Sequence, residues 1–475
     1  AADGSKDENV FDILPGVALA LFVKTSKAVN NGFARVWHAE FFGNRQVKYE
    51  RLGNQQLDST QWAELRPKYP YYLFIPVDSL GEFEYLEGWK LTEIFPINSI
   101  GISTSRDKLA VRLTAGEMLQ TVKDFAALSV DDARGKYDLG ADTLDWKVSL
   151  AQDDLRQSHC SAERIHPLLY RVFDTRYTYY TGRSRGFLSR PRPEVSQHML
   201  EGDNLMLCSN RQVNNDFRHV FVSKMPIDGN AVSLASRERT YGFLLYIRRD
   251  ARTNENSQLN LNISHDEIPD VGNRTPNLSP TFIAEMAAKL GLTFNPLQRE
   301  TGEEEFGPED VFHYIYALLH SPTYRERYAE FLKIDFPRVP LTGDAALFRA
   351  LAGLGRELAA LHLLEAPQVN QFITRYPVPG DNRVAASYPQ FTHAAGEAAG
   401  RVHLNPTQYF DGVPPEVWAF HVGGYQVLDK WLKDRRGRQL SYDDLTHYQR
   451  VVVALQRTLA LMTAIDAAIP AWPLA

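Results

Sequence analysis

The chain has 475 residues, of which 44% are hydrophobic and 23% are charged, and its formal net charge is −6. This composition excludes an intrinsically disordered chain, and the length predicts two or three domains. The negative charge argues mildly against a polyanionic partner, although the place where basic groups cluster matters more than the total.

Membrane insertion, secretion and disulfide bonding find no support in the sequence. The longest uninterrupted apolar stretch is Val17–Val23, whereas a membrane span needs about 20 apolar residues. The N-terminus has no basic region followed by a long apolar one, so we expect no secretion signal. The two cysteines, Cys160 and Cys208, form no CxxC pair, which fits a protein of the reducing cytoplasm.

The first hundred residues are expected to be mostly extended. Val10–Val23 is predicted to form two short buried strands, because continuous apolar runs of this length usually need cover on both faces. Ala34–Leu52 is predicted to form a hairpin that turns at Gly43-Asn44. Two more extended pieces are expected at Tyr69–Val77 and Ile94–Thr104.

The middle of the chain mixes helix and strand. Apolar residues at helical spacing predict a helix over Thr114–Ala133. Strands are predicted at Asn204–Ser209, His219–Ser223 and Tyr241–Arg248. The polar run Arg249–Pro276 predicts a loop or an irregular connection.

The last 200 residues are expected to be helical. Helices are predicted at Thr281–Leu290, Glu309–His320, Pro322–Lys333, Ala345–Leu364, Pro415–Trp431 and Ser441–Ala468. Ser279-Pro280 is typical of a helix start, and Ser441 with Asp444 is typical of a capping box. The whole pattern predicts a mixed α+β fold.

The segment LYRVFDTRYTYYTGRSRGFLSRPR (Leu169–Arg192) carries the most informative local signal. It contains six arginines and one acid, Asp174, which is expected to pair with Arg176 or another arginine. Guanidinium groups bind phosphates or guanine edges, and tyrosines stack on bases. The segment is therefore a candidate nucleic-acid contact, although an arginine-rich surface strand with its tyrosines in the core explains the pattern equally well.

Three other patterns resemble catalytic or metal motifs. His313 and His320 share a helix face, but they lack a third ligand and are better explained as packed core histidines. Asp145-Trp146-Lys147 is the single acid-x-lysine triplet and the one candidate for a magnesium-dependent nuclease half-motif. Asn405-Pro406-Thr407-Gln408-Tyr409 departs from the Asn-Pro-Pro-Tyr loop of amino-methylating DNA enzymes and is better explained as a turn.

Familiar catalytic sequences are missing. The chain contains no G-x-x-x-x-G-K-[ST] loop, no GxSxG and no HExxH. We therefore expect no catalytic residues, no cofactor-binding residues and no metal ligands in this chain.

Four blocks of sequence resemble the C-terminal portion of Type ISP restriction-modification enzymes. NVFDILPGVALALFVK (Asn9–Lys24) resembles strands late in the methyltransferase core, and FDTRYTYYTGRSRGFLSRPR (Phe173–Arg192) resembles the entry to the recognition region. FGPEDVFHYIYALLHSPTYRERYAEFLKIDFPRVPL (Phe306–Leu341) and the stretch Asn405–Leu455 resemble its helical end. These blocks extend over nearly the whole chain, and the last two are long and distinctive.

The resemblance implies an organisation and a function. Residues 1–100 are expected to be the end of a methyltransferase core, 101–300 a β-rich target-recognition domain, and 301–475 a helical part packed behind it. The implied function is sequence-specific binding of double-stranded DNA, with no membrane partner, in the cytoplasm of a bacterium that defends itself against phage.

The parent enzyme implied by the resemblance methylates adenine with S-adenosylmethionine and also uses ATP and magnesium. The glycine motif for the cofactor and the catalytic loop of the family precede the block that starts at Asn9, so we expect them in an upstream methyltransferase and translocase portion of the same enzyme. The expected DNA contacts are Arg171, Arg176, Tyr179, Tyr180, Arg183, Arg185, Arg190 and Arg192, and Arg211 and Lys224 extend the surface.

Two other functions remain open from the sequence. The chain is alternatively a structural module that couples methyltransferase to translocase, which the negative charge and the helical end favour. The third alternative is a magnesium-dependent nuclease that uses Asp145 and Lys147.

Overall fold

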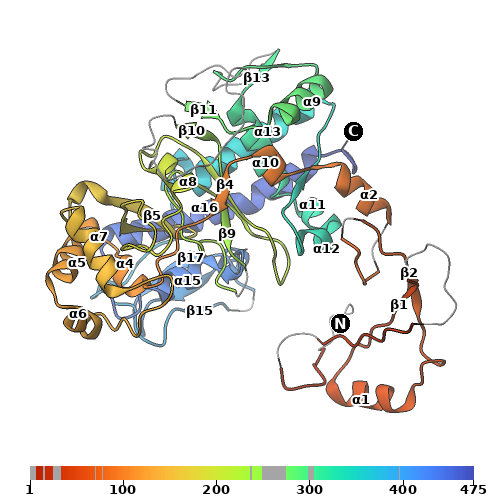
Figure 1. Ribbon diagram of the computed structural model, residues 1–475, viewed down its shortest axis with the longest axis horizontal. Coiled ribbons are helices and arrows are strands. Elements are labelled where there is room, and N and C mark those ends of the chain that lie inside the picture. The colour runs from red at the N-terminus through yellow and green to blue at the C-terminus, as the bar shows by residue number, and fades with distance from the viewer. Residues whose placement is uncertain are drawn as a thin grey trace. The chain divides into compact units, whose positions relative to one another are not determined.

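The computed structural model describes residues 7–13, 17–24, 34–69, 71–76, 79–235, 238–248, 274–297, 304–394 and 396–474. The chain divides into two compact units, Ala1–Phe83 and Glu84–Ala475 (Figure 1). The division falls within helix α2 (Ser79–Glu87). Helices and small sheets alternate along the second unit, which confirms the predicted α+β class.

The first unit contains little regular structure. Strand β1 (Val36–His38) pairs antiparallel with β2 (Ala63–Leu65), and helix α1 (Arg45–Asn54) lies between them in sequence. The predicted hairpin over Ala34–Leu52 is therefore wrong. The side chain of Asn44 accepts a hydrogen bond of 3.0 Å from the amide of Val47, so this residue caps a helix instead of making a turn.

The strands predicted within Val10–Val23 are also wrong for the residues that the structure describes there. Residues 10–13 and 17–23 form no strand, and the side chains of Leu19 and Phe22 are 88% and 85% exposed. A buried strand needs partners on its edges and cover on its faces. None of the described hydrophobic side chains within residues 7–83 is buried.

The second unit contains a four-stranded antiparallel sheet. Its order is β4 (Asn98–Ile100), β9 (Thr240–Leu244), β7 (Met206–Asn210) and β8 (Val220–Ser223). Every residue of β7 and β8 is buried, so both faces of the sheet are covered there. The three strands predicted from their apolar runs are confirmed, with the third divided into β9 and β10 (Tyr246–Arg248).

Three two-stranded sheets connect further segments of the second unit. The pairs are β10 with β11 (Arg274–Pro276), β3 (Trp89–Lys90) with β14 (Arg338–Val339), and β12 (Thr293–Phe294) with β13 (Glu305–Phe306). Most of the predicted connection Arg249–Pro276 lies outside the described residues; its last three residues form β11.

A cluster of short helices packs beside the hairpin of β5 (Ile165–Arg171) and β6 (Asp174–Tyr179), as Figure 1 shows. The helices are α4 (Asp107–Ala110), α5 (Ala115–Ala127), α6 (Val130–Lys136) and α7 (Val148–Gln157). The helix predicted over Thr114–Ala133 is divided, because Thr114 caps α5 and Ser129 caps α6. Met118, Val122 and Phe125 enter the shared core, as their spacing predicted.

The last 200 residues are largely helical, as predicted. The helices are α9 (Pro280–Leu290), α10 (Pro308–Leu318), α11 (Pro322–Arg327), α12 (Ala329–Leu332), α13 (Ala345–His362), α14 (Pro415–Trp418), α15 (Val427–Lys433) and α16 (Tyr442–Ala468). Short helices elsewhere in the unit are α3 (Leu91–Ile94), α8 (Pro193–Ser196), η1 (Ala162–Arg164), η2 (Gln197–Met199) and η3 (Pro367–Asn370). Ser441 and Asp444 form the expected capping box at the start of α16.

The sequence pattern missed two β elements in this part. The predicted helix Pro415–Trp431 is interrupted by β18 (His421–Val422) and β19 (Tyr425–Gln426), between which Gly423 adopts a φ of +58°. A three-stranded sheet of β15 (Gln390–Thr392), β16 (Gly400–His403) and β17 (Tyr409–Val413) was not predicted.

Helix α16 is the longest helix among the described residues. It is the one helix there with the length and apolar composition of a membrane span. Its buried side chains, which include Tyr448, Val452 and Leu455, belong to the core, and the helix contacts α10, α11 and α13. These contacts account for its apolar composition.

Candidate DNA interface

The first half of the basic segment is the β5–β6 hairpin, and its tip is buried. Phe173 lies at the turn with a φ of +58°, and its ring centroid is 5.0 Å from that of Phe221 and 5.8 Å from that of His362. The amide of Val172 donates to the hydroxyl of Tyr425 at 2.8 Å. The hairpin therefore joins the sheet region to the helical part.

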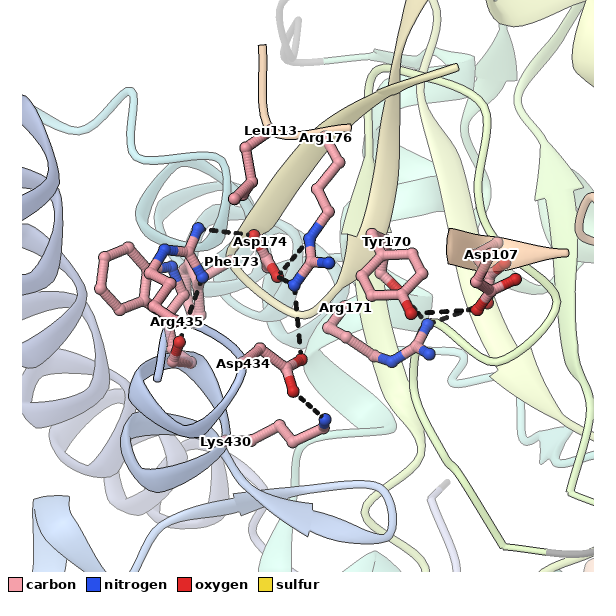
Figure 2. A network of polar contacts seen from close by, with 12 residues as sticks. Asp107, Leu113, Tyr170, Arg171, Phe173, Asp174, Arg176, Lys430, Asp434 and Arg435 are labelled. Atoms are coloured by element: carbon pink, nitrogen blue, oxygen red, sulfur yellow. Dashed lines mark hydrogen bonds and ion pairs between the residues drawn. The ribbon is translucent and has the colours of Figure 1, made fainter. Parts of the chain in front are cut away.

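An ion-pair network surrounds the tip of this hairpin, and Figure 2 shows it with Asp174 between two guanidinium groups. Asp174 is 1% exposed and lies 2.7 Å from both Arg176 and Arg435. Burial alone would raise the pKa of Asp174, but the two arginines outweigh it and hold the pKa below its ordinary value. The predicted pairing of Asp174 with Arg176 is confirmed, and Arg435 is a partner that the sequence did not suggest.

Two of the predicted contact arginines are occupied inside the protein. The guanidinium of Arg171 is buried against Asp228 at 2.9 Å, and that of Arg176 is also 3.5 Å from Asp434. Both guanidinium groups stack on the ring of Tyr170, at 3.8 and 4.0 Å from its centroid. Their role here is to hold the hairpin in place.

The two predicted contact tyrosines are core residues as well. The hydroxyl of Tyr179 donates to Ser158 at 2.9 Å, and its ring packs edge-on against Phe187. Tyr180 is 6% exposed, and burial raises the pKa of its hydroxyl. For these tyrosines the alternative of a surface strand with its aromatic residues in the core describes the structure, and the accessible surface expected at Arg171, Tyr179 and Tyr180 is not present.

The second half of the segment is a loop with fixed ends and an exposed middle. Asp154 of α7 is 3% exposed and accepts hydrogen bonds from the Thr181 hydroxyl at 2.9 Å and the Phe187 amide at 2.8 Å. A Cβ on Gly186 would overlap the Asp154 carboxylate, so this position requires glycine. The pKa of Asp154 is raised by burial. The loop from Thr181 to Arg192, called the basic loop below, is thereby held on α7.

The basic loop presents arginines at the surface. Arg183, Ser184 and Arg185 are exposed. Arg185 has a φ of +59°, and its amide donates to the carbonyl of Ser189 at 2.9 Å, so the main chain of the loop closes on itself. The guanidinium of Arg183 donates to the Gln157 side chain at 2.7 Å. The side chains of both arginines are accessible to solvent.

A cleft of about 530 Å³ lies beside the end of the basic loop. Its charged lining residues are Asp107, Asp145, Arg190, Arg192, Asp228 and Arg239. Arg190 is held by two main-chain hydrogen bonds of 3.0 Å with Ser103, and its side chain lies 2.9 Å from Asp145. Burial raises the pKa of Asp228 to about 6 although Arg171 opposes this shift.

Three of these charged cleft residues, Asp107, Asp228 and Arg239, were not found by the sequence analysis. Asp228 and Arg239 lie far along the chain from the basic segment, and the structure brings them to it through the pairing of Ile102 with Asp228 and of Ser103 with Arg190. The guanidinium of Arg239 donates to Asn230 at 3.1 Å and to Ser103 at 2.9 Å. No local pattern around Asp228 or Arg239 marks them.

The two predicted outlying contacts are surface cations with acidic partners. Arg211 is 3.2 Å from Asp335, and Lys224 is 2.6 Å from Glu365. Neither lines the cleft. Their contact with DNA stays a prediction.

Two of the patterns that resemble metal or catalytic motifs have structural roles. His313 and His320 are buried, and burial lowers the pKa of His313 to about 3. Within the described residues there is no group of three or more His, Cys, Asp or Glu side chains that could hold a metal ion. Asn405 accepts hydrogen bonds from the amides of Thr407 at 3.1 Å and Gln408 at 2.8 Å, so this segment is the predicted turn.

Known proteins resemble the chain in sequence and in fold. Residues 93–464 match the family model of the Type ISP C-terminal specificity domain. No curated protein sequence matches the chain.

Three similar solved structures are complexes with DNA. The DrdV–DNA complex has a TM-score of 0.61 at 19% identity and is matched over 90% of this chain and 43% of its own. A nuclease-deletion mutant of the Type ISP restriction-modification enzyme LlaGI, with a DNA substrate mimic, has a TM-score of 0.56 at 18% identity over 89% and 38%. The ATP-dependent Type ISP enzyme LlaBIII bound to DNA has a TM-score of 0.60 at 17% identity over 93% and 28%.

The chain thus spans less than half the length of each of these structures. The family match covers the sheet, the basic loop, the cleft and nearly all of the helical part. The chain belongs to the family of Type ISP C-terminal specificity domains.

Proposed function

We propose that this chain recognises the target sequence in double-stranded DNA for a restriction-modification enzyme. The observation that carries the proposal is the basic loop, which Asp154 holds on either side of the exposed Arg183 and Arg185, and which ends at a polar cleft. Rigid placement of exposed guanidinium groups suits phosphate contact, because little entropy is lost on binding. The DNA complexes formed by proteins of similar fold support it.

The two parts of the interface suit different tasks. Arg183 and Arg185 are exposed and form no ion pair with another residue that the structure describes. Such arginines supply affinity that depends on salt, because each neutralised phosphate releases counterions. The cleft carries as many aspartates as arginines, together with Asn230, and so offers donors and acceptors to the edges of bases. Outside the cleft, the arginines that we assign to phosphate contact are Arg183 and Arg185.

We further infer that the intact enzyme methylates adenine with S-adenosylmethionine and that an upstream portion, which also uses ATP and magnesium, carries this chemistry. Residues 93–464 match the specificity family, and the chain spans less than half the length of the similar solved structures, which supports this division of labour. The exposed apolar side chains of residues 7–83, such as Leu19 and Phe22, suit burial against that upstream methyltransferase portion.

The apolar exposure of residues 7–83 also favours a second candidate function, a module that couples the methyltransferase to the translocase. In that account the hairpin network around Asp174 transmits contacts between parts of the enzyme and the chain touches DNA little. Weak binding of DNA that is insensitive to loss of the loop arginines would support this alternative.

The double variant Arg183→Ala/Arg185→Ala tests the proposed function. We expect duplex DNA affinity at low salt to fall by roughly 10- to 100-fold, because two charge-assisted phosphate contacts are lost. The slope of log K against log salt should become shallower by about two, one for each arginine. Fluorescence anisotropy with a labelled duplex between about 50 and 200 mM salt measures both quantities.

A matched control removes the same charge elsewhere. Arg383→Ala/Arg401→Ala changes two half-exposed arginines that lie outside the basic loop and the cleft. We expect its salt slope to remain close to that of the wild type. Equal effects of the two double variants would reject the assignment of the phosphate contacts to the basic loop.

A further inference from the structure

The ion pair between Arg190 and Asp145 is the solvent-accessible ion pair of the cleft. The side chains of Arg190 and Asp145 are 51% and 43% exposed and lie 2.9 Å apart. The second aspartate of the cleft, Asp228, is buried against Arg171, and the third, Asp107, accepts a hydrogen bond of 3.0 Å from Tyr170. Asp145 is therefore the cleft carboxylate that an incoming duplex meets together with a contact arginine.

Both sides of this pair are held in place by the protein. The main chain of Arg190 is bonded in both directions to Ser103. Trp146, next to Asp145, is fully buried, and its indole nitrogen donates to the carbonyl of Phe187 in the basic loop at 3.1 Å. The main chain beside Asp145 is thus anchored to the same loop that carries Arg190, so the two side chains of the pair extend from fixed positions.

The pair is also easy to replace. An ion pair between half-exposed side chains contributes little to stability, because water and salt screen it. A DNA phosphate offers Arg190 a ligand of the same charge and a similar geometry. In the free protein, the carboxylate of Asp145 is the anionic partner of Arg190.

We propose that Asp145 is a specificity-determining residue that competes with the DNA backbone for Arg190. This inference rests on the proposed function. On a duplex without the target sequence, the contact with Arg190 requires displacement of Asp145 and brings the phosphate close to a carboxylate, so the contact gains little. On the target, the displaced carboxylate accepts a hydrogen bond from an amine on a base edge, and this contact, which forms with the target alone, offsets the repulsion. Asp145 therefore lowers binding to non-target DNA more than binding to the target.

The experiment compares Asp145→Asn with Asp153→Asn on random-sequence duplex and on the selected target duplex. Asp153 is a half-exposed aspartate on α7, the helix that anchors the basic loop, so its replacement removes the same charge close to the same surface. We expect Asp145→Asn to raise affinity for random duplex by about 3- to 10-fold near 50 mM salt, as for removal of one like charge near a phosphate in water. Its salt slope should steepen by about 0.9, which corresponds to one additional neutralised phosphate.

The double variant Asp145→Asn/Arg190→Ala isolates the competition from general charge effects. Without Arg190, the steeper salt slope and most of the gain in affinity for random duplex should disappear, because the loss of the Asp145 charge then releases no guanidinium group. The ratio of target to random affinity should fall in Asp145→Asn and remain unchanged in Asp153→Asn.

Two results overturn the inference. The first is an equal change in affinity and salt slope in Asp145→Asn and Asp153→Asn. The second is a gain in affinity for random duplex that is as large in Asp145→Asn/Arg190→Ala as in Asp145→Asn. Failure of the proposed function itself gives a different result, because neither the wild-type chain nor the Asp145→Asn variant would then bind either duplex.

Discussion

Replacement of Asp174 with alanine is expected to lower the free energy of unfolding by about 3–5 kcal/mol, as for loss of one partner from a buried ion pair. The change leaves the guanidinium groups of Arg176 and Arg435 without the carboxylate that they share at 2.7 Å. Arg435 is 5% exposed, so water cannot replace the lost partner easily. Chemical denaturation followed by tryptophan fluorescence measures the loss.

The pH dependence of this effect has a definite sign. The pKa of Asp174 is lower in the folded chain than its ordinary value of 3.8. Its contribution is therefore present above about pH 4 and is lost as the pH falls further through the folded pKa. The gap in stability between the wild type and Asp174→Ala should shrink in acid.

Controls separate this network from ordinary surface charge. Asp153→Ala removes a half-exposed ion pair of 3.5 Å with Arg156 and is expected to cost less than about 0.5 kcal/mol. If Asp174→Ala does not fold, Asp174→Asn keeps the shape of the side chain and removes the charge. A cost for Asp174→Asn no greater than that of Asp153→Ala would contradict the role assigned to the network.

The second large effect is expected at Gly355, in the contact between helices α10 and α13. A Cβ at this position would overlap the main-chain carbonyl oxygen of His313, and a backbone atom in a packed helix pair cannot move away cheaply. We expect Gly355→Ala to lower the free energy of unfolding by about 1–3 kcal/mol, as for overpacking.

The same helix supplies the control for this prediction. A Cβ on Gly353 would meet nothing within 4 Å, so Gly353→Ala should be neutral or stabilise the chain by up to about 1 kcal/mol through helix propensity. Thermal unfolding of both variants tests the contrast. If the two alanine variants have the same melting temperature, the close contact of α10 with α13 is not as the structure places it.

Local sequence patterns predicted the helices and strands that are determined by residues close together in the sequence. The α16 capping box and the buried runs of β7 and β8 follow from residues near one another in sequence. The pattern failed at Val10–Val23, where the cover that an apolar strand needs is not supplied within the described part of the unit. It failed again at Pro415–Trp431, where Gly423 turns the chain within an apolar stretch that otherwise has helical spacing.

The candidate site was predicted in part for the same reason. Six arginines in one segment indicated a contact surface, and the sequence predicted the local pair of Asp174 with Arg176. It cannot show which guanidinium groups meet acids from distant segments. Arg171 finds Asp228 and Arg176 finds Asp434 only through tertiary pairing over long separations. The exposed pair in the cleft depends on Asp145, which the sequence had singled out as a nuclease candidate and not as a partner of Arg190.

The most direct test of the account is selection of a binding site by the purified wild-type chain. Random-sequence duplex retained by the protein is amplified over several rounds and sequenced, and its affinity is then measured by anisotropy across the same salt series. The account predicts convergence on one short site and an affinity that falls steeply with salt. A pool that remains random, or a chain that binds no duplex even at about 50 mM salt, would contradict the claim that this chain recognises DNA by itself.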